Sequence, residues 1–88
     1  MTNVHILRAL RPADAPAAAA LHALGFADPW SEAAFAGEIA DPSTVTVAYF
    51  EDGALIAFAL AREVAGEADL LTVATQPARR KEGFANAL

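Results

Sequence analysis

Apolar and polar residues alternate in four segments of the chain, which is the pattern of half-buried β-strands. The first segment is residues 4–10 (VHILRAL), and the other three follow one another within residues 44–75 as TVTVAYFED, ALIAFALAREV and EADLLTVAT. Asp52-Gly53 and Ala65-Gly66 separate these three. Because two-residue turns of this kind join antiparallel neighbours, we predict a meander of three antiparallel strands.

Helical spacing of apolar residues appears between the first and second strands. Residues 15–24 (APAAAALHAL) have high helix propensity, with Asp14 placed to cap the helix and Gly25 to end it. Ser31 is placed to cap a second helix that ends in the ADPS segment. The expected buried faces are Ala17, Ala18, Leu21 and Leu24 on the first helix, and Phe35 and Ile39 on the second.

These elements predict an α+β fold with a mainly antiparallel sheet, in the order β-α-α-β-β-β-α. The last helix is expected to begin in the final apolar run, GFANAL. We find no linker and no repeat, so residues 1–88 are interpreted as a single domain.

Composition and charge exclude several classes of function. The net charge of −5 and the pI of about 4.7 argue against a nucleic-acid partner or an anionic membrane surface. The absence of cysteine excludes disulfides and thiolate metal sites, and the two histidines show no metal-ligand spacing. No apolar run is long enough to span a membrane and the first residues do not resemble a signal peptide, so we expect a cytoplasmic protein.

Positive charge is concentrated in one place. Arg79, Arg80 and Lys81 make up half of all lysine and arginine, and Gly83 follows them directly before the final apolar run. A glycine at a strand-to-helix junction lets backbone N–H groups approach an anion such as a phosphate closely. The alternatives are a solvated helix start and a glycine that merely permits a tight turn.

The same segment resembles a known family signature. QPARRKEGFANAL is similar to the acetyl-CoA loop of the Gcn5-related N-acetyltransferases, [Q/R]-x-x-G-x-[G/A], with Arg80, Gly83 and Ala85 in the three diagnostic places. EADLLTVATQP and EDGALIAFALAREV resemble the family's fourth strand and third-strand hairpin. LGFADPWSEAAF resembles a segment of the bacterial ribosomal-protein alanine N-acetyltransferases. The resemblance covers the whole chain.

The resemblance implies a fold, a co-substrate and a set of binding residues. The fold would be the N-terminal portion of an acyl-CoA N-acyltransferase, and acetyl-CoA would be the co-substrate. An irregularity at the end of the fourth strand would expose backbone groups to the pantetheine arm, and the following loop would bind the diphosphate. Glu82 and Asn86 depart from the residues usual at their places. The implied binding residues are Val73, Ala74, Thr75, Arg80, Lys81, Glu82, Gly83, Phe84, Ala85 and Asn86.

The leading functional hypothesis is acetyl transfer from acetyl-CoA to a protein or peptide amine, with the N-terminal amine of a ribosomal protein as one candidate. In the family, the fifth strand, general base and proton donor come after this point, so the 88-residue chain alone is expected to be incomplete and inactive, with no catalytic residue of its own. The alternative is a truncated, non-catalytic module that binds coenzyme A weakly or self-associates through an open sheet edge. A third reading is a phosphate-binding fold outside the family.

Several other residues are candidates for a functional role. Asp69, with Glu67, fits the place of a carboxylate base in some relatives, but a solvated strand start is the favoured interpretation. Both lie on a strand whose alternation places them on one face with Leu71 and Val73. Trp30 is interpreted as either core or substrate wall, and Ser31 as a helix cap. No role is assigned to His5, to His22, which is expected to face solvent, or to Tyr49 and Phe50, which are expected on opposite strand faces.

Overall fold

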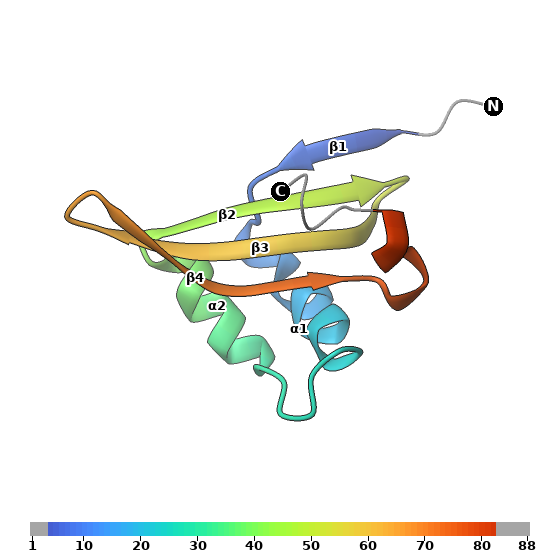
Figure 1. Cartoon of the computed structure of the whole chain (residues 1–88), viewed down its shortest axis with the longest axis horizontal. Coiled ribbons are helices and arrows are strands. Elements are labelled where there is room, and N and C mark those ends of the chain that lie inside the picture. The colour runs from blue at the N-terminus through green and yellow to red at the C-terminus, as the bar shows by residue number, and fades with distance from the viewer. Residues whose placement is uncertain (1–3, 83–88) are drawn as a thin grey trace.

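The computed structural model describes residues 4–82 as one sheet with two helices packed on it (Figure 1). Four antiparallel strands lie in the order β1-β2-β3-β4, and both helices cover the same face of the sheet. The α+β prediction with a mainly antiparallel sheet is confirmed, while the predicted last helix lies outside the described residues. The elements are β1 (His5–Arg8), the 3-10 helix η1 (Pro12–Asp14), α1 (Ala15–Ala23), α2 (Glu32–Ala40), β2 (Thr44–Glu51), β3 (Ala54–Val64), β4 (Glu67–Thr75) and the 3-10 helix η2 (Pro77–Glu82).

Both predicted turns have left-handed backbone at their two central residues. Asp52 and Gly53 have φ values of 51° and 85°, and Ala65 and Gly66 have φ values of 55° and 84°. Positive φ at both central residues is the mark of a type I′ turn, which matches the twist of the strands it joins. Ala65 is unusual there, because a Cβ disfavours left-handed backbone.

Two β-bulges set which side chains face the helices. The register shifts once between β2 and β3, which leaves Ile56 as the extra residue, and once between β3 and β4, which leaves Leu71 as the extra residue. This bulge lies in the middle of β4, on the edge that pairs with β3. The irregularity that the family resemblance implies at the end of the strand concerns its other edge and stays a prediction. Because Asp69 pairs with Arg62 while Val73 pairs with Ala59, three residues away, the predicted sharing of one face by Asp69 and Val73 is wrong.

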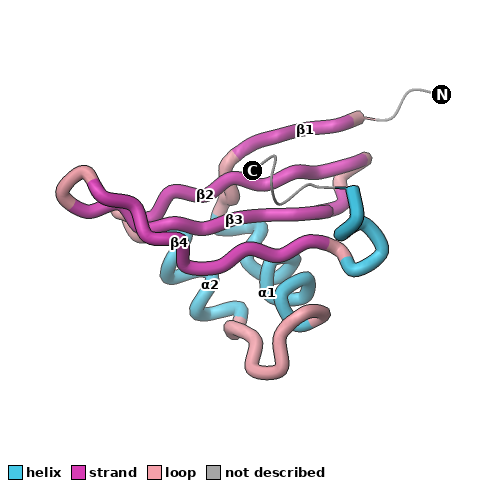
Figure 2. The backbone as a smooth tube through the Cα atoms, in the orientation of Figure 1, coloured by secondary structure: helices cyan, strands magenta, loops and turns pink. Residues whose placement is uncertain are grey.

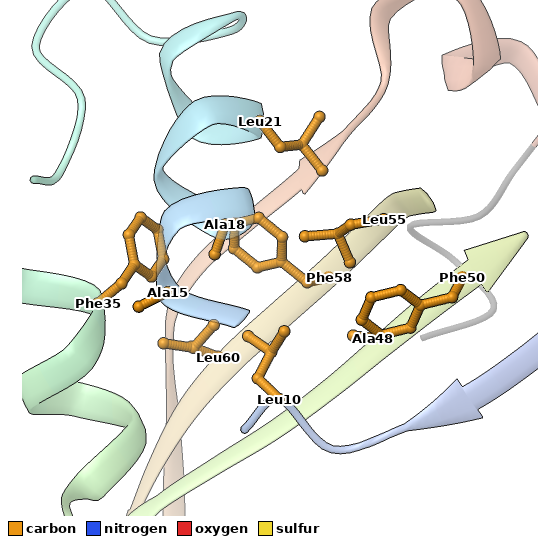
Figure 3. Close-up of a cluster of buried hydrophobic side chains, with 10 residues drawn as sticks. All are labelled: Leu10, Ala15, Ala18, Leu21, Phe35, Ala48, Phe50, Leu55, Phe58 and Leu60. Carbon is orange, nitrogen blue, oxygen red and sulfur yellow. The ribbon is translucent and has the colours of Figure 1, made fainter. Parts of the chain in front are cut away.

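The core lies between the helices and the helix-facing side of the sheet (Figure 3). Phe58 and Phe35 are fully buried and meet edge to face, with ring centroids 5.4 Å apart. Phe50 is buried on this side while Tyr49 points to the other, as predicted. The buried hydrophobic cluster is Leu10, Ala15, Ala18, Leu21, Phe35, Ala48, Phe50, Leu55, Phe58 and Leu60.

The buried stripe of α1 differs from the predicted one. Leu24 is 58% exposed because the helix ends at Ala23, and Ala17 is exposed because its side chain points away from the sheet. The buried residues are Ala15, Ala18, Leu21 and His22. Asp14 is the residue before α1, as predicted, but its carboxylate accepts hydrogen bonds from Arg8 and from the Arg11 N–H and does not cap the helix.

The predicted N-terminal cap and buried face of α2 agree with the structure. Ser31 Oγ accepts a hydrogen bond from the Ala34 N–H at 3.1 Å, so the interpretation of Ser31 as a helix cap is confirmed. Phe35 is buried, and Ile39 is partly buried against the core.

Candidate functional site

The outer edge of β4 carries three of the predicted binding residues. β4 is the last strand of the sheet, so its other long edge pairs with no strand among residues 4–82 (Figure 2). The Gln76 N–H donates to the Ile56 carbonyl at 2.8 Å, which fixes the alternation of the ladder at this end. In an antiparallel pair, the backbone groups of successive residues point alternately toward the partner and away from it. Val73 and Thr75 therefore direct their N–H and C=O groups to the outer edge, and Ala74 directs its groups to Phe58.

This alternation gives the backbone groups of Val73 and Thr75 a different role from those of Ala74. Val73 and Thr75 are placed to bind a ligand that lies along the edge, in the manner of an added strand. The Ala74 backbone serves the ladder, and its side chain packs against the core. Of the three residues, two have backbone groups that suit the predicted contact.

The basic segment begins in η2, directly after β4. The Arg79 guanidinium donates two hydrogen bonds to the Glu51 carboxylate, at 2.8 and 2.7 Å. This pairing lowers the pKa of Glu51 to about 2, with a further contribution from the Tyr49 hydroxyl, which donates to Glu51 at 3.0 Å. His5 contacts the same hydroxyl. Arg79 thus fastens the start of the basic segment to the helix-free face of the sheet.

The remaining predicted loop residues lie partly or wholly outside the described part of the structure. The backbone of residues 80–82 belongs to η2, and their side chains lie outside the described part of the structure. Gly83, Phe84, Ala85 and Asn86 lie outside the described residues altogether.

The two carboxylates of β4 lie far from its C-terminal end. Glu67 and Asp69 are exposed beside the β3–β4 turn. Since a strand rises about 3.3 Å per residue, Asp69 lies roughly 20 Å from Thr75 along the strand. This arrangement supports the interpretation of a solvated strand start, and we assign no general base among residues 4–82.

A groove of about 310 Å³ runs along the outer side of α2. Its lining includes Trp30, which precedes α2, and Glu38 and Asp41 at the C-terminal end of the helix. Glu38 accepts hydrogen bonds from Arg62 at 2.6 and 2.9 Å. Trp30 also packs against the core, which agrees with its interpretation as a core residue, and its role as a substrate wall stays a prediction. The remaining lining residues are Ala33, Ala34 and Gly37.

His22 is a functional candidate that the sequence reasoning missed. It was expected to face solvent, but it is 1% exposed. Its Nε2 lies 3.0 Å from Thr72 Oγ1, and its Nδ1 accepts a hydrogen bond from the Trp30 N–H at 3.0 Å. The spacing Ala15, Ala18, His22 is that of one helix face, which is the signal that would have indicated burial.

Comparison with known proteins supports the fold described above. No family model matches the chain, and no curated protein matches it. Among solved structures, the ribosomal-protein-S18-alanine N-acetyltransferase from Escherichia coli is similar over 97% of this chain, with a TM-score of 0.86 and 29% identity. The chain has the fold of the Gcn5-related N-acetyltransferases. The resemblance predicted from the sequence is confirmed.

More distant structures share this fold. A putative acetyltransferase of this family from Desulfovibrio desulfuricans has a TM-score of 0.74 and 20% identity over 99% of the chain. An aminoglycoside 6'-N-acetyltransferase from Acinetobacter baumannii has a TM-score of 0.72 and 18% identity over 96%. The chain spans 54% of the E. coli enzyme, 61% of the Desulfovibrio protein and 65% of the Acinetobacter enzyme.

Within residues 4–82, every helix is too short or too polar to cross a membrane. The same residues contain no cluster of three or more His, Cys, Asp or Glu side chains that is placed to hold a metal ion.

Proposed function

We propose that this chain contributes the acetyl-CoA-binding strand and loop of an N-acetyltransferase that acts on a protein or peptide amine. The observation that carries the proposal is the outer edge of β4, where Val73 and Thr75 direct backbone groups outward immediately before the basic segment. The fold similarity to N-acetyltransferases supports the same reaction class.

The residues of the edge and the loop suit the parts of acetyl-CoA. The pantetheine arm contains amide groups, which can pair with the outward backbone groups of Val73 and Thr75 as a strand would. The diphosphate carries negative charge, and residues 80–86 offer two basic side chains and a glycine-containing backbone. Arg79 contributes by holding the segment against Glu51 and not by facing the anion directly.

The reaction itself is a simple exchange of bonds at the acetyl carbon. The neutral amine forms a C–N bond to that carbon while the C–S bond of the thioester breaks, and the amine proton leaves with the sulfur by way of a base. An outward N–H near the thioester oxygen would stabilise the negative charge that develops there. A protein or peptide amine as acceptor is supported by the E. coli enzyme, which acts on an alanine of ribosomal protein S18. Cytoplasmic location stays a prediction from the sequence.

Calorimetric titration with coenzyme A tests the proposal. Gly83→Val adds a branched side chain where the diphosphate should approach the backbone, so affinity should fall at least about tenfold. Gly37→Val is the matched control. A Cβ at Gly37 meets no atom within 4 Å, and Gly37 lies on α2 and not on the β4 edge or the basic segment. Equal affinity in wild type and Gly83→Val, with unchanged circular dichroism, would contradict the proposal.

A second candidate function is self-association through the same edge. The outer edge of β4 is long, and Leu70 on this strand is 66% exposed, which favours pairing with another strand. Coenzyme A and a second copy of the chain would compete for the edge. Calorimetric titration with coenzyme A, measured alongside sedimentation, separates the two candidates: a monomer that binds coenzyme A supports the transferase, and a dimer that binds none supports self-association.

A further inference from the structure

The His22 ring joins three separate segments of the fold. It sits on α1, its Nε2 meets Thr72 on β4, and its Nδ1 accepts the backbone N–H of Trp30 from the loop before α2. Phe26 stacks on the ring with centroids 3.9 Å apart, and Phe35 meets it edge to face at 5.3 Å. Each partner is thus fixed relative to a ring that is itself almost completely enclosed.

These contacts fix the protonation state of the ring. Nδ1 is an acceptor because an N–H points at it, so the neutral ring carries its proton on Nε2 and donates to Thr72 Oγ1. A second proton on Nδ1 would bring two donors face to face and break the bond to Trp30. Burial also lowers the pKa of His22, since the enclosed ring loses hydration when it is charged.

We propose that His22 is a positioning residue that holds the Trp30 loop and β4 at a fixed spacing on α1, and that protonation of His22 releases them. Thr72 lies directly before Val73, so the ring positions the β4 edge, and Trp30 is the wall of the α2 groove. The consequence for coenzyme A binding rests on the proposed function. The coupling between the Trp30 loop and β4 is independent of the proposed function.

Uncharged groups surround the ring within the described structure. Phe26 and Trp30 come from the loop, Phe35 from α2 and Thr72 from β4. The charged residues of the neighbouring elements are engaged or exposed elsewhere. Asp14 of η1 binds Arg8, and Glu38 and Asp41 at the end of α2 lie near Arg62. The remaining carboxylate residues are exposed: Asp28 in the loop before Trp30, Glu32, Glu63, Glu67 and Asp69. We call the contacts of His22 with Trp30 and Thr72 the clamp, and its titration as the pH falls below about 6.5 is therefore that of His22.

Trp30 fluorescence reports on the clamp without any ligand, because Trp30 is the only tryptophan of the chain. We expect one step in its emission as the pH falls below about 6.5, the ordinary pKa of histidine. His5→Gln is the matched control: His5 is exposed and is the other histidine, so the step should persist. His22→Asn can keep an acceptor near the Nδ1 position but does not titrate, so the step should vanish while the emission at pH 8 is retained.

Nitrogen-15 spectra of the wild-type imidazoles check the same geometry without a substitution. At pH 8, His22 should be the Nε2–H tautomer, and the Trp30 and Thr72 amide signals should titrate with the same midpoint as its ring. An Nδ1–H tautomer, or a Trp30 step that survives in His22→Asn, would overturn the clamp. Movement of Trp30 without Thr72 would overturn the coupling to β4.

Calorimetry with coenzyme A then separates the clamp from the proposed function. His22→Asn loses the bond to Thr72, so its dissociation constant at pH 8 should rise about two- to tenfold. Wild-type affinity in His22→Asn would overturn the role of His22 toward the cofactor edge. If the wild type binds no coenzyme A while the Trp30 step and the linked titration of Thr72 are present, the proposed function fails and the clamp stands.

Discussion

The hydrogen bond between His22 and Thr72 can be measured by a double-mutant cycle. Thr72→Val keeps the shape of the side chain but removes the acceptor of the His22 Nε2–H. Both residues are buried, since His22 is 1% exposed and Thr72 is 8% exposed. A buried donor left unpaired costs about 1–3 kcal/mol of the free energy of unfolding. In the His22→Phe background that donor is gone, so Thr72→Val should cost far less.

Urea denaturation at pH 7.5 of the four proteins gives the coupling energy. We expect about 1–2 kcal/mol, within the range seen for residues that share a hydrogen bond. Thr46→Val crossed with His22→Phe is the control, because Thr46 Oγ1 accepts from the Leu10 N–H and has no contact with His22. That cycle should be additive within about 0.5 kcal/mol. Additivity in the Thr72 cycle would refute the hydrogen bond as described.

Three further predictions follow from single features. Acidification should destabilise the fold between about pH 4.5 and 2. Pairing with Arg79 lowers the pKa of Glu51, pairing with Arg8 lowers the pKa of Asp14, and both interactions are lost as the carboxylates protonate. Thermal melts across this range check the prediction, and a melting temperature that does not change with pH would count against the two pairs. Ala65→Asn should raise the free energy of unfolding by about 0.5–1 kcal/mol, because asparagine tolerates positive φ, whereas Ala68→Asn should not. Leu70→Lys should reduce self-association in sedimentation if the β4 edge pairs between copies; an unchanged mass distribution would exclude that edge.

Local patterns carried most of the fold prediction. The alternation of TVTVAYFED and its neighbours, with Asp52-Gly53 between them, determined the strands and the I′ turns because both depend on residues close in sequence. The β-bulge at Leu71 could not be predicted in this way, since it depends on how β4 meets β3. It moved Val73 to the face opposite Asp69.

The candidate site was predictable in composition but less so in geometry. The resemblance of the basic glycine segment indicated the fold that the chain has, but the choice between Val73, Ala74 and Thr75 needed the ladder alternation. Arg79 was interpreted as part of the anion site, and its partner Glu51 lies 28 residues away in sequence. The burial of His22 was missed because a polar residue on an alanine-rich helix was assigned to the solvent face.

Amide spectra of the chain titrated with acetyl-CoA test the central claim most directly. The account predicts that the N–H signals of Val73 and Thr75 shift strongly, that Ala74 between them shifts much less, and that residues 80–86 shift together with them. The groove residues Ala33 and Gly37 should stay unchanged. Saturable shifts in this alternating pattern would support acetyl-CoA binding at the β4 edge. No shift at millimolar acetyl-CoA, or shifts that centre on the α2 groove and leave Val73 and Thr75 unmoved, would contradict it.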